Sequence, residues 1–270
     1  MKIVLASRLD KDEAVAYAAS LASFLEETGH EIAFESGTAE HLGREGVPFE
    51  EFSADLVVVV GGDGSVLLAV HRMRRQIPLL GINWGEVGFL TSLEPEEVPA
   101  FVSDHLQHFT VEPRMRISLS ADGRWLGNAL NEAVIITSRP AKMLRFAVAI
   151  NGVHTDRFRA DGLLISTPTG STAYAMSAGG PIVDPRIEGV LLVPLAPYML
   201  SSRPHVISSD RSLQVRLEGA KPAHLVIDGQ ATFELERDTV IDVVKAKEPA
   251  LLVNAGKHFF ERVDHKLRCL

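Results

Sequence analysis

One short segment constrains the fold of this chain more than any other. A run of valines, Val57–Val60, leads directly into Gly61-Gly62-Asp63-Gly64-Ser65. An uninterrupted β-branched run is typical of a strand covered on both faces, as in a parallel sheet. The residues that follow, Ser65–Arg75, have a helical composition, and their basic residues fall in the closing turns, where the helix dipole favours positive charge. The segment therefore predicts a buried strand, a glycine turn and a helix.

Strand and helix signals alternate over residues 1–112. Asp10 is a candidate N-cap for an Ala-rich amphipathic helix, which Gly29 ends. Alternation of this kind predicts parallel pairing with right-handed crossovers, so we expect an α/β domain with a Rossmann-like parallel sheet. The tail, residues 250–270, contains a helical stretch that we expect to pack back on this domain. The predicted strands are Lys2–Ala6, Glu31–Phe34, Asp55–Val60 and Ile77–Ile82.

The pattern changes near Pro113. Residues 113–249 offer short alternating strands separated by Asp122-Gly123, Asn151-Gly152 and Asp228-Gly229, dipeptides that supply the positive φ angles of tight hairpins. We therefore predict a second, all-β domain, mainly antiparallel and built as a β-sandwich. Its candidate strands are Met115–Ser120, Ala133–Thr137, Phe146–Ile150, Val190–Val193, Leu213–Leu217, His224–Ile227 and Thr239–Val244.

Composition excludes several classes of protein. The chain has 270 residues, a net charge of −8 and an isoelectric point near 5.7, so it lacks the basic character of a general nucleic-acid binder. Cys269 is the single cysteine, which excludes an intrachain disulfide and a thiolate metal site. No apolar run reaches the ~20 residues that span a bilayer, and no signal peptide is evident. We expect a soluble cytoplasmic protein without nucleic-acid or membrane partners.

The glycine turn is the strongest candidate for chemistry. Glycines after a buried strand leave backbone amides pointing outward, and the following helix N-terminus adds partial positive charge suited to phosphate. Asp63 would lie beside that phosphate, able to accept a hydroxyl proton or help hold a metal ion. The alternative is a simple strand-end turn in which Asp63 only caps the helix. Neither a Walker A loop nor the Rossmann glycine spacing is present, because Leu67 stands where the third glycine belongs.

Two further segments suit a nucleoside. Arg159-Ala160-Asp161-Gly162 leads through a short strand to the segment 167–181, which crowds hydroxyls between glycines and offers the ring of Tyr174 for stacking. The alternative is an irregular turn whose hydroxyls cap the backbone. Asn131-Glu132, at the head of an apolar strand, could clamp the two hydroxyls of a ribose, although such pairs are commonly solvated strand ends. The histidines show no metal-ligand spacing.

In this order and spacing the three segments resemble the NAD kinase family, over residues 55–230. Gly61–Ser65 stands where the family carries Gly-Gly-Asp-Gly-Thr, and Gly81–Gly85 with Gly88–Thr91 is similar to the next family stretch. The most specific match is Asp161–Pro181; the tail Phe259–Arg268 is also similar. The resemblance implies transfer of the terminal phosphoryl of ATP, or of inorganic polyphosphate, to the 2′-hydroxyl of the adenosine ribose of NAD.

The resemblance also implies roles for individual residues. Asp63 would be the catalytic base, and Gly61, Gly62, Gly64 and Ser65 would form the turn that holds the phosphate donor. Asn131 and Glu132 would bind a ribose, and Asp161 would lie near the nicotinamide. The residues implied to bind NAD are Asp63, Gly64, Phe89, Asn131, Glu132, Lys142, Arg159, Asp161, Thr172, Ala173, Tyr174, Ser177, Ala196 and Gln230.

The implied reaction also fits the residues. A ribose hydroxyl needs a base at neutral pH, and Asp63 is the sole carboxylate in the glycine turn. An acidic chain cannot neutralise triphosphate and pyrophosphate alone, so we expect Mg²⁺ or another divalent ion to bridge the donor phosphates, with no protein residue assigned as its ligand. By analogy with the family we expect a homodimer or homotetramer.

Other families and roles share part of this pattern. Phosphofructokinases share Gly-Gly-Asp-Gly-Ser but need an Asp-x-Asp segment that follows a threonine, whereas the Asp-x-Asp of this chain, Asp10-Lys11-Asp12, follows Leu9 and precedes the glycine turn. Related lipid kinases lack Thr-Ala-Tyr. A dinucleotide-binding sensor without catalysis remains an alternative, as does a structural subunit.

Overall fold

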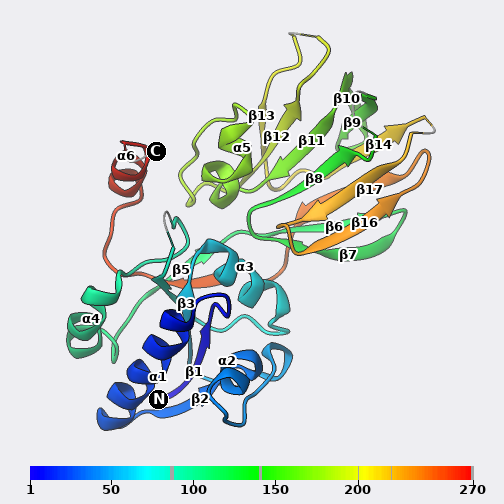
Figure 1. The fold of residues 1–270 in the computed structure, drawn as a ribbon. Helices are drawn as coiled ribbons and strands as arrows, with labels where there is room; N and C mark the ends of the chain where they lie inside the picture. The colour runs from blue at the N-terminus through cyan, green and yellow to red at the C-terminus, as the bar shows by residue number, and fades with distance from the viewer. Residues whose placement is uncertain (86–87, 140–141, 200, 220, 269–270) are drawn as a thin grey trace. The chain divides into compact units, whose positions relative to one another are not determined.

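The structure is a computed structural model that describes residues 1–85, 88–139, 142–199, 201–219 and 221–268. Cys269 lies outside the described residues. The chain divides into two compact units, Met1–Pro113 with Ala250–Leu270, and Arg114–Pro249 (Figure 1). Within the described residues, no helix is long and apolar enough to cross a membrane.

The first unit is built on a six-stranded sheet with the order β2-β1-β3-β4-β18-β5. The pairs β1–β2, β1–β3, β3–β4 and β4–β18 are parallel, and β5 at the edge makes the sheet mixed. β18 comes from the C-terminal part of the chain and lies between β4 and β5. The strands are β1 Lys2–Ser7, β2 Glu31–Phe34, β3 Leu56–Gly61, β4 Leu79–Asn83, β5 Val111–Arg114 and β18 Ala250–Val253.

Helices cover both faces of this sheet. Alternate residues of β1 and β3, such as Ile3 and Val58, share a core with the apolar side of α1 and with Phe101 of α4. On the opposite face, α3 brings Val66 against Gly81 of β4. The helices of this unit are α1 Asp12–Glu27, α2 Ser36–His41, α3 Asp63–Arg72, α4 Val98–Asp104 and α6 Phe259–Arg268, with short 3₁₀ turns η1 Phe49–Glu51 and η2 Pro95–Glu97.

The second unit contains two six-stranded antiparallel sheets. The first has the order β10-β9-β14-β17-β6-β7, with β6 Ile117–Ala121, β7 Arg124–Ala129, β9 Leu144–Ile150, β10 Val153–Ala160, β14 Leu213–Glu218 and β17 Val240–Lys245. The second has the order β13-β12-β11-β8-β15-β16, with β8 Glu132–Thr137, β11 Gly162–Ser166, β12 Gly189–Leu195, β13 His205–Ser208, β15 Ala223–Ile227 and β16 Ala231–Leu235.

One core joins these two sheets. Phe146 and Val215 from the first sheet and Ile135 and Leu225 from the second belong to the same buried cluster, so the unit is a β-sandwich. The turn η3 Thr169–Thr172 and the short helix α5 Tyr174–Ser177 follow β11, and α5 packs Ala175 on the outer face of the second sheet. The predicted fold class, an α/β domain followed by an antiparallel sandwich, is confirmed.

Two local predictions have different outcomes. The Asp-Gly and Asn-Gly hairpins are confirmed, because Asp122, Asn151 and Asp228 all adopt φ near 50° ahead of a positive-φ glycine. The N-cap assigned to Asp10 is wrong. The helix begins at Asp12 with Lys11 as its N-cap, since the Asp10 carboxylate binds the Arg8 guanidinium instead, with Nε to Oδ1 at 2.8 Å.

Candidate active site

The glycine turn joins the end of β3 to the first residues of α3. Gly61 ends the strand, Gly62 is the N-cap, and Asp63 and Gly64 open the helix. A Cβ built at Gly61 would lie 2.7 Å from Cβ of Ser65, so the tight approach of helix and strand requires a glycine there. The helix begins at Asp63, two residues before Ser65, where the composition predicted its start.

The Asp63 carboxylate does not cap its own helix. Oδ2 accepts a hydrogen bond from the backbone N–H of Phe89 at 2.7 Å, and Oδ1 accepts one from Leu90 at 2.8 Å and a longer one from Thr91 at 3.3 Å. These amides belong to the loop after β4, the strand next to β3 in the sheet. The alternative interpretation of Asp63 as a plain helix cap is therefore excluded, since three backbone N–H groups of another loop orient its side chain.

The loop that holds Asp63 approaches it closely. A Cβ at Gly88 would overlap the Thr91 hydroxyl and come within 3.1 Å of Asp63 Oδ1. Gly81 is restricted in the same way, because a Cβ there would lie 2.9 Å from Cα of Thr91. These two glycines allow backbone amides to reach the carboxylate.

Gly62 and Gly64 are different. Within the described part of the chain, a Cβ at either position would meet no atom within 4 Å, and neither residue has a positive φ. Neither packing nor backbone conformation therefore requires a glycine there. An approaching ligand would require one, since it would occupy the space that a side chain would fill.

Arg8 carries positive charge beside this turn. Its backbone N–H donates to the carbonyl of Val60, and its Nη1 donates to the carbonyl of Trp84 at 3.0 Å. The guanidinium also holds Asp10, through hydrogen bonds that lower the pKa of that exposed carboxyl to about 2.

In the second unit, Asn131 and Glu132 lie at the start of β8. Asn131 is 7% exposed, and its backbone carbonyl accepts from Thr167 N and Ser166 Oγ, which ties it to the end of β11. Among the described residues, Asn131 Oδ1 and Glu132 Oε2 are buried and have no hydrogen-bond partner. Buried polar atoms are normally paired, so these two atoms are available to bind a ligand.

Asp228 organises the backbone at the same place. Its Oδ2 accepts from Leu130 N at 2.7 Å, and its Oδ1 accepts from Asn131 N at 2.8 Å and Glu132 N at 2.9 Å. Burial, with the negative charge of Asp228 added, raises the pKa of Glu132 to about 8. Glu132 is therefore mostly a neutral acid at pH 7.

The hydroxyl-rich segment divides into two groups. Several hydroxyls satisfy the local backbone: Thr167 Oγ1 donates to Leu130 O at 2.5 Å, and Ser171 Oγ donates to Val183 O at 3.2 Å. Tyr174 and Ser177 on α5 are exposed instead, with Tyr174 at 44%. The capping interpretation thus describes the buried hydroxyls, and the exposed ones stay available to a ligand.

The predicted binding residues of this unit lie at two ends of one sheet. Asn131, Glu132 and the segment Thr172–Ser177, which includes Ala173, lie at the Ser166 end of β11, and the turn that contains Gln230 follows Asp228 there. Arg159, Asp161 and Ala196 lie at the Gly162 end, where Asp161 N donates to Leu195 O at 3.0 Å.

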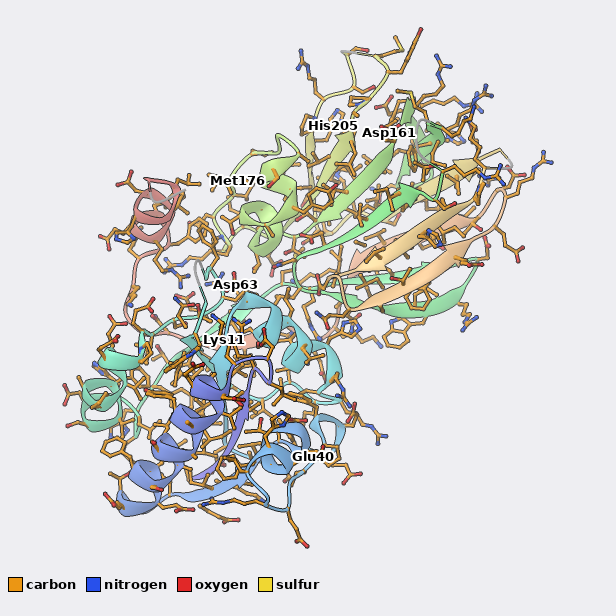
Figure 2. All side chains as sticks on the ribbon, viewed as in Figure 1. Lys11, Glu40, Asp63, Asp161, Met176 and His205 are labelled. Carbon is orange, nitrogen blue, oxygen red and sulfur yellow. The ribbon has the colours of Figure 1, made fainter. Side chains whose placement is uncertain are left out.

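These two ends are well separated. β11 has five residues, which separates its ends by roughly 13 Å. Figure 2 shows the separation through Met176, near one end, and Asp161, at the other. The exposed Lys142 lies in the chain between β8 and β9, and its backbone N–H donates to Arg139 O.

Two features of the site escaped the sequence analysis. The N–H groups of Leu90 and Thr91 orient Asp63, and Asp228, taken only as a turn residue, holds the Asn131-Glu132 pair. The one signal for Asp228 is that Asp228-Gly229-Gln230 includes a predicted binding residue. No group of three metal-ligating side chains is found among the residues that the structure describes.

Comparisons with known proteins agree with this geometry. Family models of the ATP-NAD kinase N-terminal domain and C-terminal domain match residues 3–109 and 130–255. A curated NAD kinase of Methanoculleus marisnigri is 66% identical over the full length of both chains, and one of Methanosarcina mazei is 41% identical, covering 98% of this chain and 93% of the relative.

Solved structures show the same fold. An NAD kinase from Archaeoglobus fulgidus, crystallised with ATP, superposes with a TM-score of 0.83 at 30% identity and covers all of both chains. A yeast NADH kinase complexed with NADH gives a TM-score of 0.91, covering all of this chain and 88% of the other; at 21% identity it shows the fold alone.

Curated relatives at high identity over the whole chain are kinases, so this chain is a phosphotransferase. The matches cover both units and the whole length of close relatives. The chain belongs to the NAD kinase family.

Proposed function

We propose that this enzyme transfers the terminal phosphoryl group of ATP to the 2′-hydroxyl of the adenosine ribose of NAD, which yields NADP. One observation carries the proposal. Asp63 lies at the N-terminal end of α3, and three backbone N–H groups of the loop after β4 fix its carboxylate. A carboxylate in that position combines a base with the outward amides of a phosphate turn.

Asp63 acts as the general base in this proposal. An ionised carboxylate has about four lone-pair sites, and the three N–H groups occupy two on Oδ1 and one on Oδ2. The remaining site on Oδ2 is available to a substrate hydroxyl. Because the orientation is set before substrate binds, the hydroxyl proton has a defined acceptor when the oxygen attacks phosphorus.

The open space at Gly62 and Gly64 supports a phosphate donor at the turn. Donor phosphates would occupy the volume where side chains are missing, facing the N–H groups that open α3. Phosphoryl transfer needs positioning and charge neutralisation more than covalent catalysis, and backbone amides provide the former. Gly61 and Ser65 complete the turn.

The second unit supports a dinucleotide site. Asn131 Oδ1 and Glu132 Oε2 are buried polar atoms that lack partners among the described residues, and a ribose diol would satisfy both. Tyr174 offers an exposed ring on which a base can stack, and Ser177 and Gln230 offer polar groups nearby. Phe89 and Gly64 are the proposed binding residues of the first unit.

A divalent ion, Mg²⁺ in this proposal, fits the donor set only if the phosphates supply most of its ligands. The described residues contain no cluster of three candidate ligands, and Mg²⁺ commonly binds through substrate phosphates, water and one or two carboxylates. When bound, it neutralises charge on the donor. We assign no protein residue as its ligand.

Self-association is proposed by analogy with the NAD kinase family. Arg159, Asp161 and Ala196 lie at the end of β11 opposite to Glu132. We propose a homodimer or homotetramer in which a neighbouring subunit brings these residues, with Lys142, to the dinucleotide. A cytoplasmic location also stays a prediction.

A coupled assay tests the function. Purified protein is incubated with NAD, ATP and Mg²⁺, and the product is detected by an NADP-specific dehydrogenase, which reports only the 2′-phosphate. Arms with polyphosphate as donor and NADH as acceptor define the substrate range. Signal that requires NAD and a phosphoryl donor supports the proposal, whereas a flat trace with every donor and metal favours a dinucleotide-binding sensor.

A further inference from the structure

The turn after β15 and the start of β8 meet through one carboxylate. Asp228 is 6% exposed, and three consecutive N–H groups, from Leu130 to Glu132, donate to it at 2.7–2.9 Å. Its own backbone N–H donates in return to Glu132 O at 2.9 Å. A buried carboxylate with this many donors is stabilised in its ionised form.

We propose that Asp228 is a positioning residue for the dinucleotide site, which fixes the backbone of Asn131-Glu132 and places a negative charge beside the buried Glu132 carboxyl. This inference rests on the proposed function for its effect on NAD. The effect on Glu132 itself is a property of the free protein.

Burial is the main cause of the raised pKa of Glu132, and the negative charge of Asp228 adds to it. On one side β11 presents Ser166, in register with Glu132, which carries no charge. On the other side of Glu132, Asp228 follows β15. The positive group that interacts with Asp228 is Arg116, whose pKa is raised by the charge of Asp228 and lowered, more strongly, by burial. Arg116 Nε donates to Glu248 O at 2.9 Å, so this guanidinium is shared with another site.

Two buried carboxyl groups in one place rarely ionise together. Asp228 accepts three N–H bonds and therefore takes the negative charge, while Glu132 keeps the proton. Burial, with the charge of Asp228 added, raises the pKa of Glu132 to about 8, in agreement with this assignment.

The protonated acid has a consequence for recognition. A neutral carboxyl offers one O–H donor, whereas Asn131 Oδ1 offers an acceptor. Together they match a ribose diol, whose hydroxyls both donate and accept. A neutral Glu132 also keeps a second negative charge away from the dinucleotide pyrophosphate, so NAD binds the protonated form.

Titration of Glu132 in the substrate-free protein is the first test. The ¹³C signals of the glutamate carboxyl groups are followed by NMR between pH 5 and pH 10, and Glu132 is assigned by its absence in Glu132→Gln. We expect a midpoint near pH 8 in the wild type and at least about one pH unit lower in Asp228→Asn.

Controls separate charge from structure. Asp122→Asn alters the equivalent residue of another Asp-Gly hairpin, with the same φ of 48° and a carboxylate that accepts from Val240 N at 2.9 Å, and it should leave the midpoint unchanged. If Asp228→Asn does not fold, Asp228→Ser keeps a hydroxyl oxygen that can accept from the N–H groups and removes the negative charge, so it should lower the midpoint in the same direction. A midpoint that neither variant moves overturns the inference.

The second test is KM for NAD as a function of pH. Above its midpoint the wild type should show KM rising about tenfold per pH unit, whereas Glu132→Gln should be flat. In Asp228→Asn the rise should begin at lower pH, and in the double variant the profile should be flat again. If the NMR midpoint moves as expected while KM ignores pH, the role of Asp228 stands and the assignment of Glu132 to the NAD site is overturned.

Discussion

Asp63 Oδ1 lies 2.8 Å from the backbone nitrogen of Leu90, a residue that follows it by 27 positions and belongs to another element. The orientation of the carboxylate is therefore set by the loop after β4 and not by the turn in which Asp63 stands. The glycine turn and this loop act as one unit around a single side chain.

Replacing Asp63 by Asn should lower turnover strongly. Asn keeps the shape and one acceptor oxygen but cannot take a proton from a hydroxyl, so we expect kcat to fall by about 10²–10⁴-fold with KM for NAD little changed. The coupled NADP assay measures both. Asp55→Asn makes the same change at the other end of β3, where the carboxylate binds Lys2 N, and should leave kcat unchanged. Near-normal turnover in Asp63→Asn would remove Asp63 from the role of base.

Alanine substitutions at two glycines of the turn should distinguish a glycine needed for ligand binding, Gly64, from one needed for packing, Gly61. Gly64→Ala meets no protein atom and lies in the first turn of α3, so its melting temperature should be unchanged or raised, while KM for ATP should rise about tenfold or more. Gly61→Ala would collide with Ser65 and should cost about 1–3 kcal/mol of stability. Thermal melts and donor titrations distinguish the two, and an unaltered KM in Gly64→Ala would argue against a donor at this position.

Glu132 should make stability depend on pH. Its pKa is about 8 in the folded chain and close to 4.3 when unfolded, so between these values the folded chain holds the extra proton. The free energy of unfolding should therefore fall as pH rises across that window, by up to about 1.4 kcal/mol per pH unit from this group, and level off above pH 8.

Urea unfolding of wild type and Glu132→Gln at several pH values measures the difference, since all other groups cancel. The variant should gain relative stability steadily from pH 5 to pH 8. Parallel curves for the two proteins would show that Glu132 is ionised in the fold.

Metal dependence should require the nucleotide. The described residues provide no three-ligand cluster, so Mg²⁺ alone should leave the melting temperature unchanged, whereas Mg²⁺ with ATP should raise it. EDTA should abolish turnover, and added Mg²⁺ should restore it. A clear thermal shift with Mg²⁺ alone would reveal a protein-bound ion and contradict the expectation.

Tyr174 should contribute to NAD binding through its ring. Base–aromatic stacking is worth about 1–3 kcal/mol, so Tyr174→Ala should raise KM for NAD by roughly fivefold to a hundredfold, and Tyr174→Phe should restore most of the loss. Trp125→Ala removes a more exposed ring, 64% accessible on the edge strand β7, and should have no effect. Equal effects of the two alanine variants would point to a general loss of stability.

The sequence predicted the buried strands well, because parallel strands covered on both faces have a distinctive apolar composition. It did not predict β10, whose side chains are mostly polar and exposed. β10 is an edge strand that pairs only with β9, and among its residues only Phe158 and Ala160 are buried. The helix α2 was also missed, because it has only six residues and its N-cap is Glu35, whose side chain accepts from Thr38 N, in place of the Ser, Thr, Asp or Asn preferred there.

The site was predictable where it is local. Gly61–Ser65 indicated a strand, a turn and a helix with a carboxylate, and the structure contains them. The orientation of Asp63 was not predictable, because its partners lie 26–28 positions away. The same holds for Asp228, whose partners lie 96–98 positions away, and which looks like an ordinary hairpin residue in the sequence.

The position of β18 has a consequence for synthesis of the protein on the ribosome. β4 and β5 are translated early, but the strand that lies between them, Ala250–Val253, emerges only after the whole sandwich. Until then the edge of β4 has no neighbour on one side, which is the kind of exposed edge that invites wrong pairing. The chain of the whole sandwich is therefore synthesised before the first unit receives this strand.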